Sequence, residues 1–118
     1  MAASAEFIAF LREQMADFGP VTSRRMFGGA GLYRDGTIFA LVVDDTLYLK
    51  ADGEIRAGFE AEGLQPFTYD TKLGERTITS YWRSPERCLD DPDEMTLWCR
   101  KAWGAALRAG AAKPKNKR

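Results

Sequence analysis

Histidine is absent from the 118 residues of this chain. Its absence excludes Ser-His-Asp and Cys-His catalysis and every metal site that needs an imidazole ligand. Cysteine is scarce: Cys88 and Cys99 are too few for a disulfide framework. Cys99 falls on the apolar side of a predicted helix, so we expect a buried thiol. No signal peptide opens the chain and no apolar run reaches the roughly 20 residues that span a bilayer, so we expect a cytoplasmic protein without a membrane partner.

Neither sign of charge predominates, because 17 basic residues balance 17 acidic ones. The last six residues are nevertheless basic, and the body that precedes them is acidic overall. An acidic body argues against strong autonomous binding to duplex DNA. We expect the tail, residues 113–118, to be disordered. The alternative is that it contacts a nucleic acid through counterion release, with Lys113, Lys115, Lys117 and Arg118 as the candidate residues.

Composition is that of an ordinary soluble domain, with 45% hydrophobic and 29% charged residues. A chain of this length buries enough surface to fold without a metal or disulfide. We find no internal repeat and no linker that would divide it. The sequence therefore predicts one domain over residues 1–112, followed by the basic tail.

Two amphipathic helices are predicted at the ends of the domain. Phe7, Leu11, Met15 and Phe18 recur at helical spacing, and Gly19-Pro20 ends the pattern. Ser4 is the expected N-cap. The second helix starts at Asp91-Pro92-Asp93-Glu94, where the acids suit the positive end of the helix dipole and Glu94 suits a capping box. Gly110 and Pro114 are the expected end of its apolar stripe, which comprises Met95, Trp98, Cys99, Ala102, Ala106 and Ala109.

Between the helices the pattern changes to strands. Residues 21–50 are rich in β-branched and aromatic side chains, with turn signals at Asp35-Gly36 and Asp44-Asp45. Asp52 is expected to cap a short helix that ends at Gly63. Two further strands are predicted at residues 67–69 and 77–82, joined by a loop at 70–75. Pro66 favours an edge position for the first of these two.

This order predicts an α+β fold, an antiparallel sheet of five to six strands with the N- and C-terminal helices packed on it. Residues 38–43 are apolar on both faces, and two helices cover one face only. Trp103 and Leu107 add a second apolar edge to the last helix. We therefore expect a homodimer that buries the other face. The competing expectation is that the short helix around Ile55 and Phe59 covers that face alone.

The glycine cluster that follows two arginines is the most unusual local feature. Successive glycines can bring backbone N–H groups to an anion, but here strand residues follow them instead of a helix. A bend or bulge that only glycine permits is the simpler interpretation. On a strand, the two arginines would point to opposite faces. The candidates for an interaction or anion site are Arg24, Arg25, Gly28, Gly29, Gly31 and Tyr33.

Two acidic clusters and three tryptophans have structural explanations. Turn and cap roles account for Asp44, Asp45 and the run at 90–94, whose spacing matches no EF-hand loop. Tyr81-Trp82, Trp98 and Trp103 could stack on bases, but the acids beside them offset Arg83 and Arg87. Core or interface aromatics are the better interpretation. We predict no metal site and no catalytic residues.

Several motifs lie along the chain: Met26-Phe27-Gly28-Gly29-x-Gly31-Leu32-Tyr33-x-x-Gly36, Phe39-Ala40-Leu41-Val42, Leu47-Tyr48-Leu49-Lys50, Pro66-Phe67-x-Tyr69, Tyr81-Trp82 and Trp98. Through these motifs the chain resembles the N-terminal domain of the TfoX/Sxy family over roughly residues 12 to 107. Members of this family are associated with regulating genes for natural competence and DNA uptake in bacteria. The resemblance implies a fold similar to secretion-chaperone-like domains and no catalytic residue, cofactor or metal.

Three functions follow in order of preference. The first is a non-enzymatic regulatory module that acts through contacts with an unknown protein partner or with itself. The second is a transcriptional regulator that binds nucleic acid through Arg24, Arg25 and the basic tail. The third is a binder of a small anionic ligand at the glycine cluster. The sequence predicts no cofactor for any of them.

Overall fold

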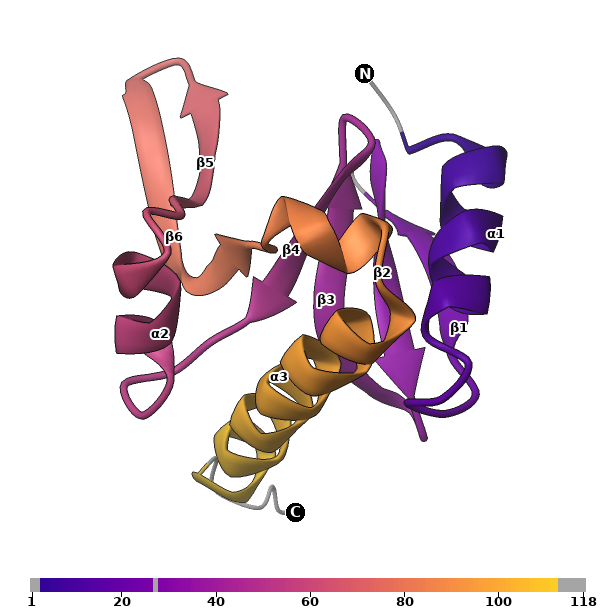
Figure 1. Ribbon diagram of the computed structural model, residues 1–118. Coiled ribbons are helices and arrows are strands. Elements are labelled where there is room, and N and C mark those ends of the chain that lie inside the picture. Colours follow the sequence, from indigo (N-terminus) through magenta and orange to yellow (C-terminus); the bar gives the residue numbers. More distant parts are fainter. Residues whose placement is uncertain (1–2, 27, 113–118) are drawn as a thin grey trace, which may run out of the picture.

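The computed structural model describes residues 3–26 and 28–112, with side chains through residue 110. The predicted α+β class is confirmed: one six-stranded antiparallel sheet, in the order β1-β2-β3-β4-β6-β5, carries helices α1 and α3 on one side (Figure 1). The basic tail at 113–118 and Phe27 lie outside the described residues. The elements are α1 Ala5–Gln14, β1 Thr22–Met26, β2 Gly29–Arg34, β3 Thr37–Val43, β4 Thr46–Lys50, α2 Arg56–Ala61, β5 Pro66–Thr71, β6 Gly74–Arg83, the 3₁₀ turn η1 Glu86–Leu89 and α3 Pro92–Ala112.

Helix α1 begins as the sequence predicts and ends earlier. The Ser4 hydroxyl accepts a hydrogen bond from the N–H of Phe7 at 3.1 Å, which caps the helix. The helix ends at Gln14, and the next residues form a turn that buries Met15 and Phe18. Those two side chains enter the core from the turn. The apolar spacing that predicted a longer helix therefore includes two residues that are buried but not helical.

Both predicted hairpin turns have backbone that suits the right-handed twist of the strands. Asp35 and Gly36 have φ of 50° and 78°, and Asp44 and Asp45 have φ of 53° and 51°. Two successive residues at positive φ are typical of the type I′ turn. The β5–β6 connection is also tighter than the predicted loop, because the strands extend to Thr71 and from Gly74.

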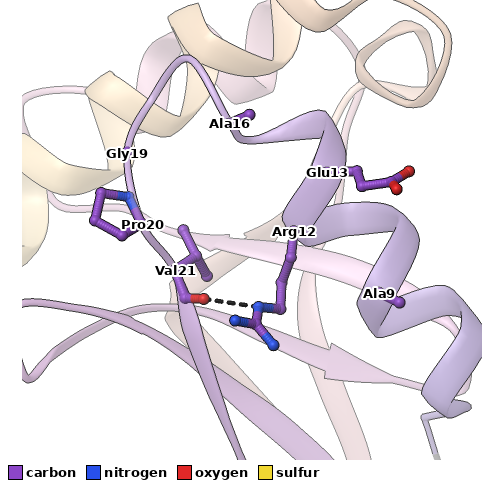
Figure 2. A pocket seen from close by; sticks show the side chains of 7 residues that line it. All are labelled: Ala9, Arg12, Glu13, Ala16, Gly19, Pro20 and Val21. Carbon is purple, nitrogen blue, oxygen red and sulfur yellow. Dashed lines mark hydrogen bonds between the residues drawn. The ribbon is translucent and has the colours of Figure 1, made fainter.

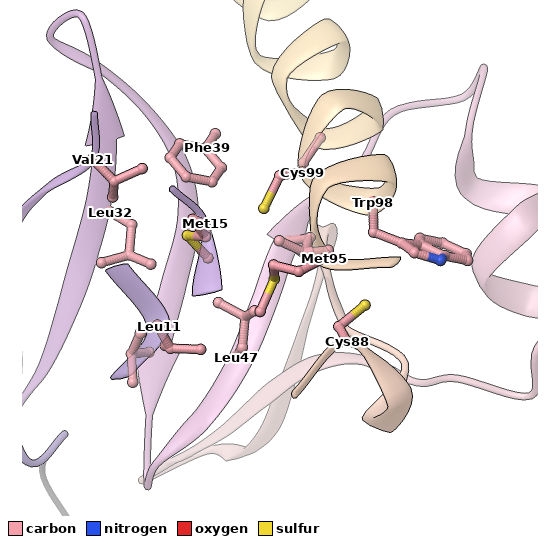
Figure 3. Close-up of a cluster of buried hydrophobic side chains, with 14 of the residues drawn as sticks. Leu11, Met15, Val21, Leu32, Phe39, Leu47, Cys88, Met95, Trp98 and Cys99 are labelled. Carbon is pink, nitrogen blue, oxygen red and sulfur yellow. The ribbon is translucent and has the colours of Figure 1, made fainter. Parts of the chain in front are cut away.

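The core lies between the sheet and its helices. A row of paired residues, Leu32–Ala40–Leu49–Trp82, crosses four strands and is buried throughout. Figure 3 shows sheet side chains pointing toward α3, where Cys99 is fully buried. The register shifts between Leu32 and Tyr33, so that strand β3 has one extra residue, Phe39. This bulge turns Phe39 into the core beside Ala40.

Helix α3 begins at Pro92 as the sequence predicts, but the role of Glu94 and the end of the helix differ from the expectation. Asp91 caps it, accepting the N–H of Asp93 at 2.9 Å. The capping box is not completed, because the Glu94 carboxylate instead accepts from Arg87 at 2.7 Å and from the Trp98 indole at 3.3 Å. The helix continues through Gly110 to Ala112. The helix is therefore longer than its apolar stripe, which ends at Ala109.

Trp103 belongs to the core and not to a second apolar edge. Its ring packs edge-on against Phe18 and Phe39, with centroids 6.2 and 6.3 Å apart. The Arg34 guanidinium lies 5.2 Å from the same ring. Leu107, the other residue of the expected edge, is 49% exposed.

Helix α2 packs on the same side of the sheet as α3. The Phe59 ring lies 5.0 Å from Trp98 of α3 and 6.1 Å from Trp82 of β6. The expectation that this helix covers the second face of the sheet is therefore wrong. Asp52 does not cap α2 directly, since Ile55 is its N-cap. Instead Asp52 binds the Arg108 guanidinium at 2.6 Å, which holds the pKa of that carboxyl below its usual value.

Gly29 should tolerate no side chain. A Cβ there would lie 2.4 Å from the Val42 carbonyl oxygen, because β2 and β3 approach closely. Gly28 has a positive φ and Gly29 does not. Glycine is therefore needed at position 29 because the two strands lie close together, which the sequence alone did not reveal. We expect Gly29→Ala to lower the free energy of unfolding by about 2 kcal/mol or more, measured by urea unfolding.

Gly53→Ala is the matched control for this change. Nothing lies within 4 Å of the Cβ that it adds. We expect a change within about 0.5 kcal/mol. Equal stability of the Gly29→Ala and Gly53→Ala variants would show that β2 and β3 are not constrained by this contact.

Trp98 should be the most costly side chain of α3 to remove. It is 4% exposed and packs against Phe59. Trp98→Ala leaves a large cavity, so we expect a loss of about 3 kcal/mol or more. Leu97→Ala, at a neighbouring position that is 48% exposed, should cost far less. Similar melting of the two variants would contradict the packing described here.

Candidate functional site

The face of the sheet that no described helix covers is the candidate site (Figure 1). A second row of paired residues runs next to the buried one and points the other way. It consists of Arg24, Gly31, Leu41, Tyr48 and Arg83, one from each of five neighbouring strands. Their side chains alternate with the buried row because successive strand residues point to opposite faces. We call this side of the sheet the open face.

The open face is apolar at its centre. Partly exposed side chains surround the row and belong to the same alternation. They are Met26, Tyr33, Ile38, Val43, Lys50, Phe67 and Tyr81. This is a contiguous apolar and aromatic surface of the kind that soluble proteins use for binding.

Aromatic rings on the open face contact one another and nearby cations. The Tyr48 and Phe67 rings meet at 4.9 Å and 67°. The Arg24 guanidinium lies 5.4 Å from the centroid of Tyr33, and the Lys50 ammonium lies 4.9 Å from that of Tyr81. Burial, with a smaller effect of Tyr33, raises the pKa of Tyr81 to about 12. Its hydroxyl therefore stays protonated and able to donate a hydrogen bond.

The structure separates the two arginines that the sequence placed together. Arg25 donates to the carbonyl oxygen of Ala3, next to α1. Arg24 points to the open face beside Tyr33. The predicted opposite orientation is therefore confirmed, and the two guanidiniums form no common anion site.

The glycines of the cluster serve the packing of the sheet. Strand β2 is paired on both sides, so the N–H groups of Gly29 and Gly31 face its neighbours. The space beside Gly31 is filled by Met26, Ile38 and Tyr33, whose atoms would come within 3.1 Å of a Cβ at this position. Gly28 sits in the β1–β2 turn at φ 78°. Of the six candidate residues, Arg24 and Tyr33 have side chains on the open face.

The other candidates of the sequence have structural roles. Asp45 accepts the N–H of Ser4 at 2.7 Å and lies in a turn, and Asp91 caps α3. Trp82 and Trp98 are buried in the core and cannot receive a base. Within residues 3–26 and 28–110, no group of three or more acidic or cysteine side chains is arranged to hold a metal ion. In the same part of the chain no helix is both long and apolar enough to cross a membrane.

A shallow groove of about 470 Å³ lies between α1 and the segment that leads into β1 (Figure 2). The Arg12 guanidinium crosses it and donates to the Val21 carbonyl oxygen at 2.7 Å. Figure 2 shows Glu13 pointing away from Arg12. The groove therefore brings together no acid–base pair, and its arginine is engaged in holding the chain that leaves α1.

The sequence predicted a second apolar face at residues 38–43 but few of the other residues that form the open face. Tyr48 and Phe67 were assigned to strands without a functional role, and Tyr81 was considered only as a residue that could stack on bases. The alternation within each strand was visible. The register between strands, which joins these side chains into one surface, could not be derived without the tertiary structure.

The class of protein is thus a small α+β domain with one sheet face in the core and the other open for contact. Residues 13–106 match the model of the TfoX N-terminal domain. Because this match covers most of the chain, the chain belongs to that family.

One similar relative is the DNA transformation protein TfoX1 of Aliivibrio fischeri. It is 33% identical to this chain over 78 residues. The matched stretch covers 63% of this chain and 37% of the relative, so the chain corresponds to little more than a third of that protein.

The two cysteines should be unreactive in the folded protein. Both are buried, and burial raises the pKa of the Cys88 thiol to about 12 and that of Cys99 as well. The thiolate is the reactive form, so at about pH 8 a disulfide reagent should label neither residue. Unfolding in denaturant should expose both thiols to the same reagent. Rapid labelling of the native chain would show that the core beneath η1 opens.

Proposed function

We propose that this chain is a non-enzymatic regulatory module for DNA uptake that acts by protein–protein contact through its open face. The open face supports this most directly: it is broad, apolar and without a helix over it. Membership of the TfoX N-terminal domain family supports a regulatory role. The name of the Aliivibrio fischeri relative, a DNA transformation protein, supports the link with uptake.

Contact, and not catalysis, fits the chemistry of the face. Its polar side chains are arginines, a lysine, tyrosines and threonines, which lack a nucleophile paired with a base. The hydroxyl of Tyr81 is held in its neutral form by burial. Such a surface recognises a partner and does not transform one.

Nucleic-acid binding is the second candidate function. It is favoured by cations beside aromatic rings on one sheet face, as at Arg24 and Tyr33. Arg25 does not contribute, since it points to the other side. The tail residues proposed for this role lie outside the described residues.

The proposed function is tested in the organism that encodes the chain. The gene is deleted and restored either as the wild type or as Leu41→Asp, which puts a charge in the middle of the open face. We expect Leu41→Asp to leave transcripts of the DNA-uptake genes at the level of the deletion strain. Leu97→Asp is the control, with the same change at an exposed position of α3.

Circular dichroism and thermal melting of the purified variants establish that both fold. Wild-type transcript levels in the Leu41→Asp strain would overturn the proposal that the open face makes the regulatory contact. Unchanged transcripts on deletion of the gene would overturn the regulatory role itself.

A further inference from the structure

Acidic side chains are distributed unevenly over the two sides of this sheet, and the open face carries cations without them. The row across the open face ends in an arginine on each side, Arg24 on β1 and Arg83 on β6. Lys50 lies one row away, and Arg76 pairs with Tyr69 farther along β6. Neither Arg24 nor Arg83 makes an ion pair within the described residues. The open face therefore combines an apolar centre with cationic ends.

None of the acids of the chain occupies a strand position on this face. The 17 aspartates and glutamates lie on the helices, in the loops and turns, or on the reverse side of the β5–β6 hairpin. Asp70 and Glu75 are the acidic residues within strands, and they pair with each other on that reverse side. The open face thus has cationic side chains and no acid at its strand positions, whereas the helical side and the turns carry all the acids together with nine of the thirteen basic residues that precede the tail.

We propose that the open face binds an acidic protein segment whose apolar side chains contact Ile38, Leu41 and Val43. Carboxylates of the segment would pair with Arg24 and Arg83, which are exposed at the two ends of the row. Those ends lie roughly 19 Å apart, because four steps separate the five strands at about 4.8 Å each. An extended segment of about six residues spans that distance. This inference rests on the proposed function, since it names the partner of the same face.

The aromatic contacts favour a peptide over a nucleic acid. Bases bind such surfaces by stacking on free ring faces. Here cations lie over the rings of Tyr33 and Tyr81, and Tyr48 and Phe67 meet edge to face. A stacked base would have to displace these groups. A carboxylate can instead bind the guanidinium of Arg24 while the cation remains on its ring.

The same charges disfavour a second copy as the occupant. A two-fold dimer through the open face would bring its arginines toward those of the partner copy. Like charges brought together in an interface are destabilising. Pairing of the open face with the helical side of another copy would be a heterologous contact, which builds rings or filaments and not a two-fold dimer.

The test selects ligands without assuming their sequence. A display library of random peptides of about 16 residues is selected on the full chain, and the selected peptides are labelled for fluorescence anisotropy. We expect enrichment of Asp and Glu together with apolar residues, and binding that weakens as salt rises from about 50 to about 300 mM.

Charge-matched variants locate the binding. Arg24→Gln with Arg83→Gln should weaken the selected peptides by about tenfold or more. Arg100→Gln with Lys101→Gln removes the same charge from α3, on the other side of the sheet, and should change the affinity by less than about twofold. Thermal melting of both double variants confirms that they fold.

Three results would overturn the inference. The first is a selection without acidic enrichment, or equal loss of binding in both double variants. The second is tight binding of a labelled oligothymidine strand that the peptides do not displace, which would identify a single-stranded nucleic acid as the ligand. The third is a dimer in sedimentation equilibrium that Leu41→Asp dissociates, which would identify a second copy.

Failure of the inference is distinguishable from failure of the proposed function. If acidic peptides bind as expected while the Arg24→Gln, Arg83→Gln strain keeps wild-type transcripts, the face binds acidic segments but this binding is not the regulatory contact. If Leu41→Asp abolishes regulation but no acidic peptide is selected, the regulatory role stands and the proposed partner is wrong.

Discussion

The packing of α3 against one side of the sheet is the interaction on which the rest of the structure depends. Met95, Cys99 and Ala102 are fully buried against the sheet, and Trp98 joins α3 to Phe59 of α2. Burial of such side chains is the main favourable contribution to folding. Because α1 and α2 pack on this same side, every described helix contributes to one core, and none covers the other side of the sheet.

That one-sided arrangement connects the fold with the charge pattern. The acids at the start of α3 and the ion pairs of Arg87 with Glu62 and Glu94 all belong to the helical side. The open face has the opposite sign at its ends and an apolar centre. For the regulatory function proposed above, complementary charge around an apolar centre would allow the open face to discriminate between partners.

Glycine has a structural role in this design. Gly29 allows the backbones of β2 and β3 to come close, and Gly31 leaves space that Met26, Ile38 and Tyr33 fill from the sides. The glycine cluster, which by sequence most resembled a ligand site, therefore determines how the strands and side chains of the open face pack. The residues that would contact a partner are the neighbours of these glycines. In the sequence most of them look like residues of an ordinary strand.

The sequence by itself determined the order of the elements, the caps at Ser4 and Asp91, the turns at Asp35-Gly36 and Asp44-Asp45 and the opposite directions of Arg24 and Arg25. These features depend on local backbone preferences and on alternation within one strand. Only the tertiary structure decided that Phe39 turns inward at a bulge, that α2 packs beside α3, and that Arg24, Leu41, Tyr48 and Arg83 form one row. Each of these depends on the register between segments distant in sequence, and a shift of one residue would have exchanged the faces.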